Sequence, residues 1–279
     1  MWHNNSPRHF WTEAYGLKRG TTAKIVCNKA AYALFRMTGR FVSSPPARNP
    51  WHWYRKPFSL RNQVIWSRSL AGWFRPENEE AIECMLHMEQ YEPVDWITLR
   101  EGMNFFDIGA YVGWHSIRAA RIIGASGRIV SFEPDPTNRR QLEANLALNG
   151  VKNCLVVPLA AWSKTGDELG WYTQKSSDCC RIDEAARSAT VKTTILDDLA
   201  ADLGLDRLDW IKIDVEGAEA EVLRGAKEIL RKHRPLLFIE IHNTVRTVRD
   251  LLGSYGYSIV REEFDGSPEP HGWFQAEPA

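Results

Sequence analysis

Cysteine is scarce in this 279-residue chain, and the few cysteines do not form the pattern of a disulfide-bonded or zinc-binding protein. They are Cys27, Cys84, Cys154, Cys179 and Cys180. The set is odd in number and unevenly spaced, and it contains no CxxC pair. Such a set favours a reducing compartment over a secreted fold. We therefore expect a cytoplasmic protein.

The sequence also lacks a hydrophobic run of the roughly 18 to 20 residues that a membrane-spanning helix needs. Its most apolar N-terminal stretch, residues 23–35, is interrupted by Lys29. No clear cleavage site of small residues follows that stretch. We expect neither a signal peptide nor a membrane span.

Acidic residues are almost absent from the first 75 residues, although the whole chain has 35 basic and 35 acidic side chains. This segment holds thirteen Lys or Arg residues and one acid, Glu13, so its charge is 13 − 1 = +12 and the remainder carries −12. It also contains six of the twelve tryptophans. Residues 43–57 are rich in Pro and aromatic side chains, which is typical of extended chain and turns. We interpret residues 1–77 as a basic, tryptophan-rich N-terminal extension and residues 78–279 as the main domain.

The basic extension is open to several interpretations. Contact with the acidic main domain explains the charge split without any partner. Contact with anionic lipid, a phosphorylated carrier or an acidic partner subunit is an alternative, and a lipid contact would place the protein at a membrane periphery. The apolar face of a helix expected over residues 21–37 fits either packing on the main domain or such a surface. A further expected helix begins at about residue 78.

Strand and helix patterns alternate from residue 100 onward. The expected strands cover residues 103–110, 128–134, 154–163, 210–217 and 235–242, and the expected helices cover residues 114–123, 137–149, 193–204 and 218–233. This alternation predicts an α/β fold with a mostly parallel, Rossmann-like sheet. Residues 258–264 and 272–278 are expected to close the sheet as an antiparallel pair.

The first strand ends in a loop with two glycines, Gly109 and Gly113. Ligands of open α/β sheets bind beyond the carboxyl ends of the strands, and glycine allows backbone to approach a ligand closely. A dinucleotide fingerprint would need glycine at the third and sixth positions from Gly109, where this chain has Tyr111 and Trp114. The pattern therefore excludes a pyrophosphate cradle and disfavours a nicotinamide or flavin enzyme.

Two acids at this edge suit a nucleoside that carries a charged amino-acid tail. Glu133 ends the second strand, where a carboxylate can accept hydrogen bonds from both ribose hydroxyls. Asp107 ends the first strand and can hold an ammonium group directly or through water. Each acid, taken alone, could instead cap a turn or a helix N-terminus.

Six sequence blocks follow one another along the chain: FFDIGAYVGWHS, SFEPDPTNRRQLEANLALNG, AAWS, ILDDL, DWIKIDVEGAEAEVLRGA and PLLFIEIH. In this order they resemble the FkbM-type methyltransferases, which belong to the class I S-adenosylmethionine-dependent enzymes. The resemblance implies S-adenosylmethionine bound at the loop from Asp107 to Gly113, which includes Ala110, with Glu133 on the ribose. It also implies adenine beside Asp135 and the pair formed by Ala161 and Trp162. Tyr111 departs from the family pattern, which usually has Asn at this position.

The fourth and fifth strands deliver candidate catalytic groups. A hydroxyl that accepts a methyl group must lose its proton, so a base is needed within hydrogen-bond reach. We select Asp214, Glu216 and His242, with Asp214 contacting the cofactor amino group or the acceptor. Glu216 could also serve as a helix-start acid, and His242 could be either a general base or a hydrogen-bonded structural histidine. Carboxylates and one His could hold magnesium or manganese, but no spacing rule singles out a metal site, and we expect none.

The leading functional hypothesis is an O-methyltransferase that acts on a hydroxyl of a sugar, glycan or other polyhydroxylated small molecule. The acceptor class depends on the resemblance alone, because a fold does not determine a substrate. A nucleic-acid methyltransferase would use the basic aromatic arm to contact phosphates and stack on bases. A non-catalytic binding module that retains the fold is the third alternative.

Overall fold

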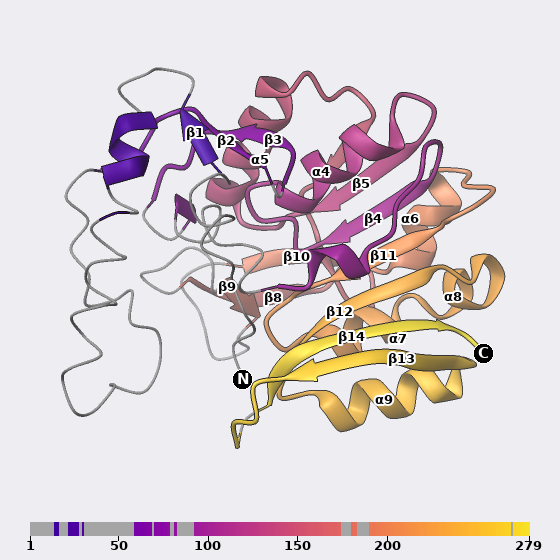
Figure 1. The fold of residues 1–279 in the computed structure, drawn as a ribbon. Helices are drawn as coiled ribbons and strands as arrows, with labels where there is room; N and C mark the ends of the chain where they lie inside the picture. Colours follow the sequence, from indigo (N-terminus) through magenta and orange to yellow (C-terminus); the bar gives the residue numbers. More distant parts are fainter. Residues whose placement is uncertain are drawn as a thin grey trace. The chain divides into compact units, whose positions relative to one another are not determined.

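The computed structural model describes residues 14–16, 22–27, 30, 59–68, 70–78, 81–82, 92–173, 180–182, 190–268 and 270–279 (Figure 1). The chain forms two compact units, residues 1–92 and residues 93–279. This boundary lies 92 − 77 = 15 residues beyond the one expected from composition.

In the first unit, three short antiparallel strands form a small sheet in the order β1-β2-β3. They are β1 (Ala14–Gly16), β2 (Ile65–Ser67) and β3 (Gly72–Phe74). Trp66 and Trp73 face each other across β2 and β3, with ring centroids 5.4 Å apart. Residues 22–27 are helical, within the helix expected over residues 21–37. Residue 30 is helical as well, whereas the other residues of that expected helix and the Pro-rich stretch 43–57 lie outside the described residues.

The second unit is organised around a seven-stranded sheet in the order β6-β5-β4-β11-β12-β14-β13 (Figure 1). Its strands are β4 (Asn104–Ile108), β5 (Arg128–Phe132), β6 (Cys154–Val157), β11 (Trp210–Ile213), β12 (Leu236–His242), β13 (Tyr257–Phe264) and β14 (His271–Pro278). The first five strands in this order are parallel, and β14 runs antiparallel to both of its neighbours, β12 and β13. The structure therefore confirms the α/β fold and the closing antiparallel pair.

The central strands are apolar on both faces because side chains are buried on each side of the sheet. Phe105 packs in one core with Ala119 and Ile123 of the following helix. Its neighbour Phe106 belongs to the core on the other face, which includes Val222 and Leu252. Alternation along a strand sends consecutive side chains to opposite faces, so one phenylalanine pair stabilises both layers.

Six helices are bounded in the described part of the second unit: α4 (Trp114–Ile123), α5 (Pro136–Leu148), α6 (Leu196–Asp202), α7 (Glu219–Arg224), α8 (Lys227–His233) and α9 (Val245–Ser254). The expected helix 114–123 is confirmed. The single helix expected over residues 218–233 is wrong, because the chain breaks at Gly225. A Cβ there would lie 1.9 Å from the carbonyl oxygen of Trp162, so the two backbones touch. Among the described residues, none of the helices combines the length and apolarity needed to cross a membrane.

A second sheet of four strands, which the sequence did not predict, lies in the same unit in the order β7-β10-β8-β9. Its strands are β7 (Ala160–Ala161), β8 (Glu168–Thr173), β9 (Cys180–Ile182) and β10 (Thr190–Thr194). The third strand expected over residues 154–163 is therefore two strands in two different sheets. They part around Pro158, which has no N–H to continue a ladder. The helical stretch expected over residues 193–204 begins only at Leu196, because its first residues complete β10.

Candidate active site

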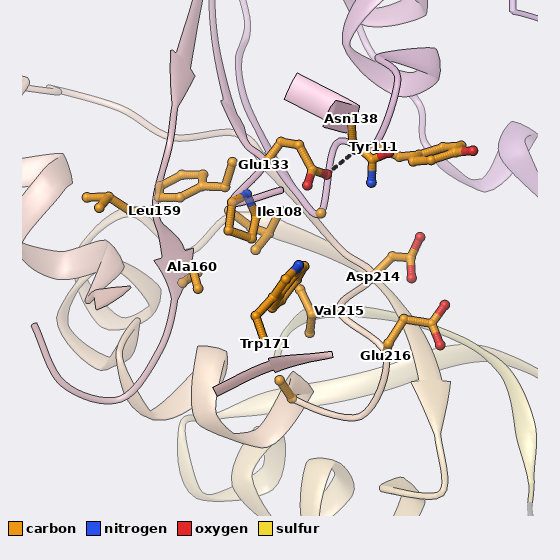
Figure 2. Close-up of a pocket in the computed structure, with 15 residues that line it drawn as sticks. Ile108, Tyr111, Glu133, Asn138, Leu159, Ala160, Trp171, Asp214, Val215 and Glu216 are labelled. Carbon is orange, nitrogen blue, oxygen red and sulfur yellow. Dashed lines mark hydrogen bonds between the residues drawn. The ribbon is translucent and has the colours of Figure 1, made fainter. Parts of the chain in front are cut away.

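A cavity of about 620 Å³, partly open to solvent, lies beyond the carboxyl ends of β4, β5 and β11 (Figure 2). Its wall consists of Ile108, Gly109, Tyr111, Phe132, Glu133, Pro134, Asn138, Leu159, Ala160, Ala161, Trp171, Asp214, Val215, Glu216 and Ala218. Most of these side chains are apolar, and the carboxylates are few. This mostly apolar lining with a few polar groups is typical of a small-molecule or cofactor site.

The glycine loop after β4 lies directly against the segment that follows β11. Gly109 has φ +79°, and a Cβ at this position would lie 1.8 Å from the carbonyl oxygen of Asp214. Tyr111, two residues on, also has a positive φ of 50°, a conformation that is uncommon for a residue with a side chain. This strained turn directs the Tyr111 N–H at Glu133, and glycine at 109 lets the two backbone segments touch.

Glu133 is 5% exposed and accepts two backbone hydrogen bonds at the cavity wall. Its Oε2 accepts from the Tyr111 N–H at 2.8 Å, drawn dashed in Figure 2, and its Oε1 accepts from the Asp135 N–H at 2.9 Å. Burial raises the pKa of Glu133 to about 8, although these two N–H donors oppose the shift. A ligand that donates hydrogen bonds to this carboxylate would favour its charged form.

A buried lysine lies beneath the glycine loop. Lys212 on β11 is 3% exposed, and its Nζ donates to the carbonyl oxygen of Gly109 at 2.9 Å. The same ammonium lies 3.3 Å from Asp214 Oδ2 and 3.6 Å from Oδ1 of the fully buried Asp107. Asp107 Oδ2 accepts from the Ser116 hydroxyl. The ammonium group that Asp107 holds in this structure is therefore that of Lys212.

Asp214 and Glu216 follow β11, and His242 ends β12 on the neighbouring strand. His242 Nε2 lies 3.6 Å from Glu216 Oε2, and its Nδ1 lies 3.0 Å from Glu219 Oε1. Glu219 is fully buried, and its second oxygen accepts from the Thr244 hydroxyl at 2.7 Å. Glu219, the first residue of α7, also accepts from the N–H of Gly217. It therefore orients His242 and joins the two strand ends.

The charges of this edge shift the pKa values of three groups. Burial alone would lower the pKa of His242, but the hydrogen bond with Glu219 and the nearby carboxylates raise it to about 10. Burial alone would raise the pKa of Asp214, but the positive charges of Lys212 and His242 lower it. The hydrogen bond to Glu240 raises the pKa of His271, which lies beside His242 with ring centroids 4.9 Å apart. A protonated His242 must lose its proton before it can act as a base.

The structure places only some of the sequence-selected residues on the cavity wall. Those on the wall are Gly109, Glu133, Ala161, Asp214 and Glu216. The others near it but not on it are Asp107, Ala110, Gly113, Asp135, Trp162 and His242. Asp135 caps α5 by accepting from the N–H groups of Thr137 and Asn138. Gly113 precedes α4 with φ +94°.

Sequence reasoning missed two contributors to the site. Lys212 could have been found, because it is a single charge within the apolar strand Trp210–Ile213. Trp171 on β8 had no such signal, since the small sheet that carries it was not predicted. Its indole lines the cavity and donates from Nε1 to Asp135 Oδ2 at 3.3 Å.

The cavity chemistry fits S-adenosylmethionine. Apolar walls, including Phe132 and Trp171, suit an adenine ring, and the two hydrogen-bonded oxygens of Glu133 suit a ribose diol. The Asp214 carboxylate, also on the wall, can contact a cationic amino-acid tail or the acceptor. No phosphate-binding cradle is formed by this loop, in which Tyr111 and Trp114 replace the glycines of a dinucleotide fingerprint.

Comparisons with known proteins agree with this chemistry. Residues 107–259 match the model of the Methyltransferase FkbM domain. Methyltransferase sdnD of Sordaria araneosa is 29% identical, over 58% of this chain and 76% of that protein. The hexuronic acid methyltransferase AglP of Haloferax volcanii is 25% identical, over 68% of this chain and 71% of that protein. The 2-O-methyltransferase NoeI of Sinorhizobium fredii is 36% identical over 74 residues, which are 24% of this chain and 30% of that protein.

The family match spans 259 − 107 + 1 = 153 of 279 residues and begins at Asp107, the last acid before the glycine loop. It therefore includes the cavity, Lys212 and the edge that carries Asp214 and His242. The chain belongs to the FkbM family and is an S-adenosylmethionine-dependent methyltransferase.

Proposed function

We propose that this enzyme methylates a hydroxyl of a sugar, glycan or other polyhydroxylated small molecule. The observation that carries the proposal is that the cavity wall continues into a polar edge formed by Asp214, Glu216 and His242. Such an edge offers hydrogen bonds to several hydroxyls at once. The names of two relatives, a hexuronic acid methyltransferase and a 2-O-methyltransferase, support a sugar hydroxyl.

For the cofactor, we propose that Glu133 binds the ribose hydroxyls and that Ala161 and Trp171 flank the adenine. The loop from Asp107 to Gly113, with Ala110, shapes the backbone around the amino-acid tail. Asp135 contributes by holding the Trp171 indole in place, at a distance of 3.3 Å. Trp162 contributes through its backbone, which pairs with Thr194.

Glu133→Gln is expected to weaken S-adenosylhomocysteine binding and to remove most of its pH dependence. In the free protein the pKa of Glu133 is raised to about 8 by burial, and ribose hydroxyls donate best to the charged form. Affinity of the wild-type protein should therefore rise with pH up to about 8, by up to about tenfold per pH unit, and level off above it. Calorimetric titrations of both proteins with S-adenosylhomocysteine between pH 6 and pH 9 measure this dependence of affinity on pH. An equal pH dependence in wild type and Glu133→Gln would contradict the ribose assignment.

The acceptor hydroxyl needs a proton acceptor and correct orientation. S-adenosylmethionine, when bound, would supply an electrophilic methyl group whose C–S bond would break as the new O–C bond forms, and the hydroxyl proton would pass to a base. Asp214 and Glu216 present carboxylates on the cavity wall (Figure 2). His242, which Glu219 fixes through Nδ1, directs its other nitrogen toward Glu216. We propose that these three side chains position the hydroxyl for in-line attack.

Methyl transfer to hexoses, hexuronic acids and their glycosides tests the function. We expect a methyl ether product, identified by mass spectrometry and by its stability to alkali, which would hydrolyse a methyl ester. Glu216→Gln should lower kcat by about 100-fold while S-adenosylhomocysteine binding changes little. Glu228→Gln, which alters an exposed side chain on α8, is the matched control. Transfer only to nitrogen, to carboxylate or to nucleic acid would overturn the proposal.

A further inference from the structure

We infer that Asp214, Glu216 and His242 form a binding site for one divalent cation of the Mg²⁺ or Mn²⁺ type. One ligand atom from each of these residues can be chosen so that all three lie within 4.8 Å of one another. Residue spacing did not indicate a metal site, because it does not reveal how the chain turns after β11. The catalytic role of the ion rests on the proposed function, but the binding itself does not.

The separations of the ligand atoms suit an octahedral ion. At metal–oxygen distances of about 2.1 Å, ligand atoms lie roughly 3 Å apart when adjacent and roughly 4 Å apart when opposite. His242 Nε2 and Glu216 Oε2 are 3.6 Å apart, within this range. Figure 2 shows the Asp214 and Glu216 carboxylates on the same side of the segment that follows β11. An ion can therefore be bound with small side-chain rotations.

His242 is held in the orientation that a metal ligand requires. Its Nδ1 lies 3.0 Å from Glu219 Oε1, so the ring presents Nε2 to Asp214 and Glu216. Glu219 is fully buried and is fixed in turn by the Thr244 hydroxyl and the Gly217 N–H. Metal-ligating histidines usually bond a carboxylate through the second ring nitrogen, which fixes the tautomer and raises ligand basicity. The pair of Glu219 and His242 is thus a second observation, separate from the two acids on the cavity wall, Asp214 and Glu216.

A second cluster, Glu240, His242 and His271, also meets the distance condition, but it fits an ion less well. Glu240 Oε1 and His271 Nε2 are already 2.7 Å apart and bonded to each other. Neither residue is on the cavity wall, whereas Asp214 and Glu216 both are. The geometry therefore favours the cluster that adjoins the cofactor cavity.

Two carboxylates and one imidazole are ligands that Mg²⁺ and Mn²⁺ accept, with further positions left for water or substrate oxygens. An ion here would face the acceptor and could bind two of its oxygens together. This favours acceptors with adjacent oxygens, such as a vicinal diol or a hydroxyl next to a carboxylate. A cation would also lower the pKa of the bound hydroxyl, which assists its loss of a proton.

Titration of the metal-stripped full-length protein with Mn²⁺, followed by electron paramagnetic resonance, tests the site. We expect one saturable Mn²⁺ per chain. Glu216→Gln and His242→Gln should each weaken binding at least tenfold, and Glu228→Gln should leave it unchanged. Glu216 is partly exposed, so its variant decides the outcome if the His242 variant does not fold.

Saturable binding that survives Glu216→Gln, or no saturable binding, would overturn the inference. Mn²⁺ binding that is lost in His271→Gln but retained in Glu216→Gln would assign the ion to the cluster of Glu240, His242 and His271. That result would also overturn the inference. S-adenosylhomocysteine binding and methyl transfer in EDTA separate this inference from the proposed function. Full methyl transfer in EDTA would show that the ion has no catalytic role, while the proposed O-methyltransferase activity would stand. Mn²⁺ binding without methylation of any sugar would instead contradict the proposed acceptor, while the metal site would stand.

Discussion

Gly109→Ala is expected to abolish S-adenosylhomocysteine binding and to destabilise the fold by more than about 4 kcal/mol, if the variant folds at all. A methyl group here would lie 1.8 Å from the Asp214 carbonyl oxygen and 2.9 Å from its carbonyl carbon. Neither backbone segment can move freely. The Gly109 N–H donates to the Phe132 carbonyl, and the Asp214 N–H donates to the Ile108 carbonyl.

Gly166→Ala is the matched control for this substitution. Gly166 has φ +85°, close to the +79° of Gly109, but a Cβ added at Gly166 would have no atom within 4 Å. Its replacement should cost only about 1 to 2 kcal/mol, the backbone penalty alone. Urea denaturation of both variants separates strain from steric overlap. Similar losses in the two variants would show that the contact with Asp214 relaxes and would contradict this prediction.

Lys212→Met is expected to destabilise the protein by about 3 to 5 kcal/mol, because removing one member of a buried ion pair leaves an uncompensated charge. Lys212 is 3% exposed and Asp107 is fully buried, so water cannot replace the lost ammonium. The substitution also removes the donor to the Gly109 carbonyl oxygen. We therefore expect weaker S-adenosylhomocysteine binding as well as lower stability, measured by calorimetry and urea denaturation.

The double variant Asp107→Asn/Lys212→Met provides the control. It removes both charges of the buried pair and should recover part of the lost stability, which a double-mutant cycle quantifies. Binding should not recover to the same extent, because the Gly109 carbonyl oxygen still lacks its donor. Additive losses in the cycle would mean that Lys212 and Asp107 do not interact, and the assignment of this pair would be wrong.

The strands and most helices of the second unit follow from local sequence. Residues 105–108 and 210–213 are apolar except for one charged residue each, Asp107 and Lys212, which is the pattern of strands buried on both faces. Helix 114–123 begins after Gly113. The helix pair α7 and α8 could not be predicted in this way. Residues 218–233 have one helical periodicity, and the break arises from contact between Gly225 and the distant Trp162 backbone.

The candidate site was predictable where chemistry coincides with a strand end. Glu133, Asp214 and His242 each follow or end an apolar strand, and parallel strands bring their carboxyl ends to one edge. The charged group with which each acid pairs was not predictable. Asp107 could be proposed for an external ammonium from its position, but the structure pairs it with Lys212, because β4 and β11 are neighbours in register.

Local features of the chain were enough to establish the α/β class, the cofactor type and the acids available at the sheet edge, because strand periodicity, the glycine loop and the family blocks are all contiguous in sequence. Which of those groups meet depends on the packed fold. The positive φ angles of Tyr111 and Glu216, the insertion of Trp171 and the Glu219–His242 bond all involve contacts between segments far apart in the chain. Such contacts are set by packing across the sheet, and no local pattern encodes them.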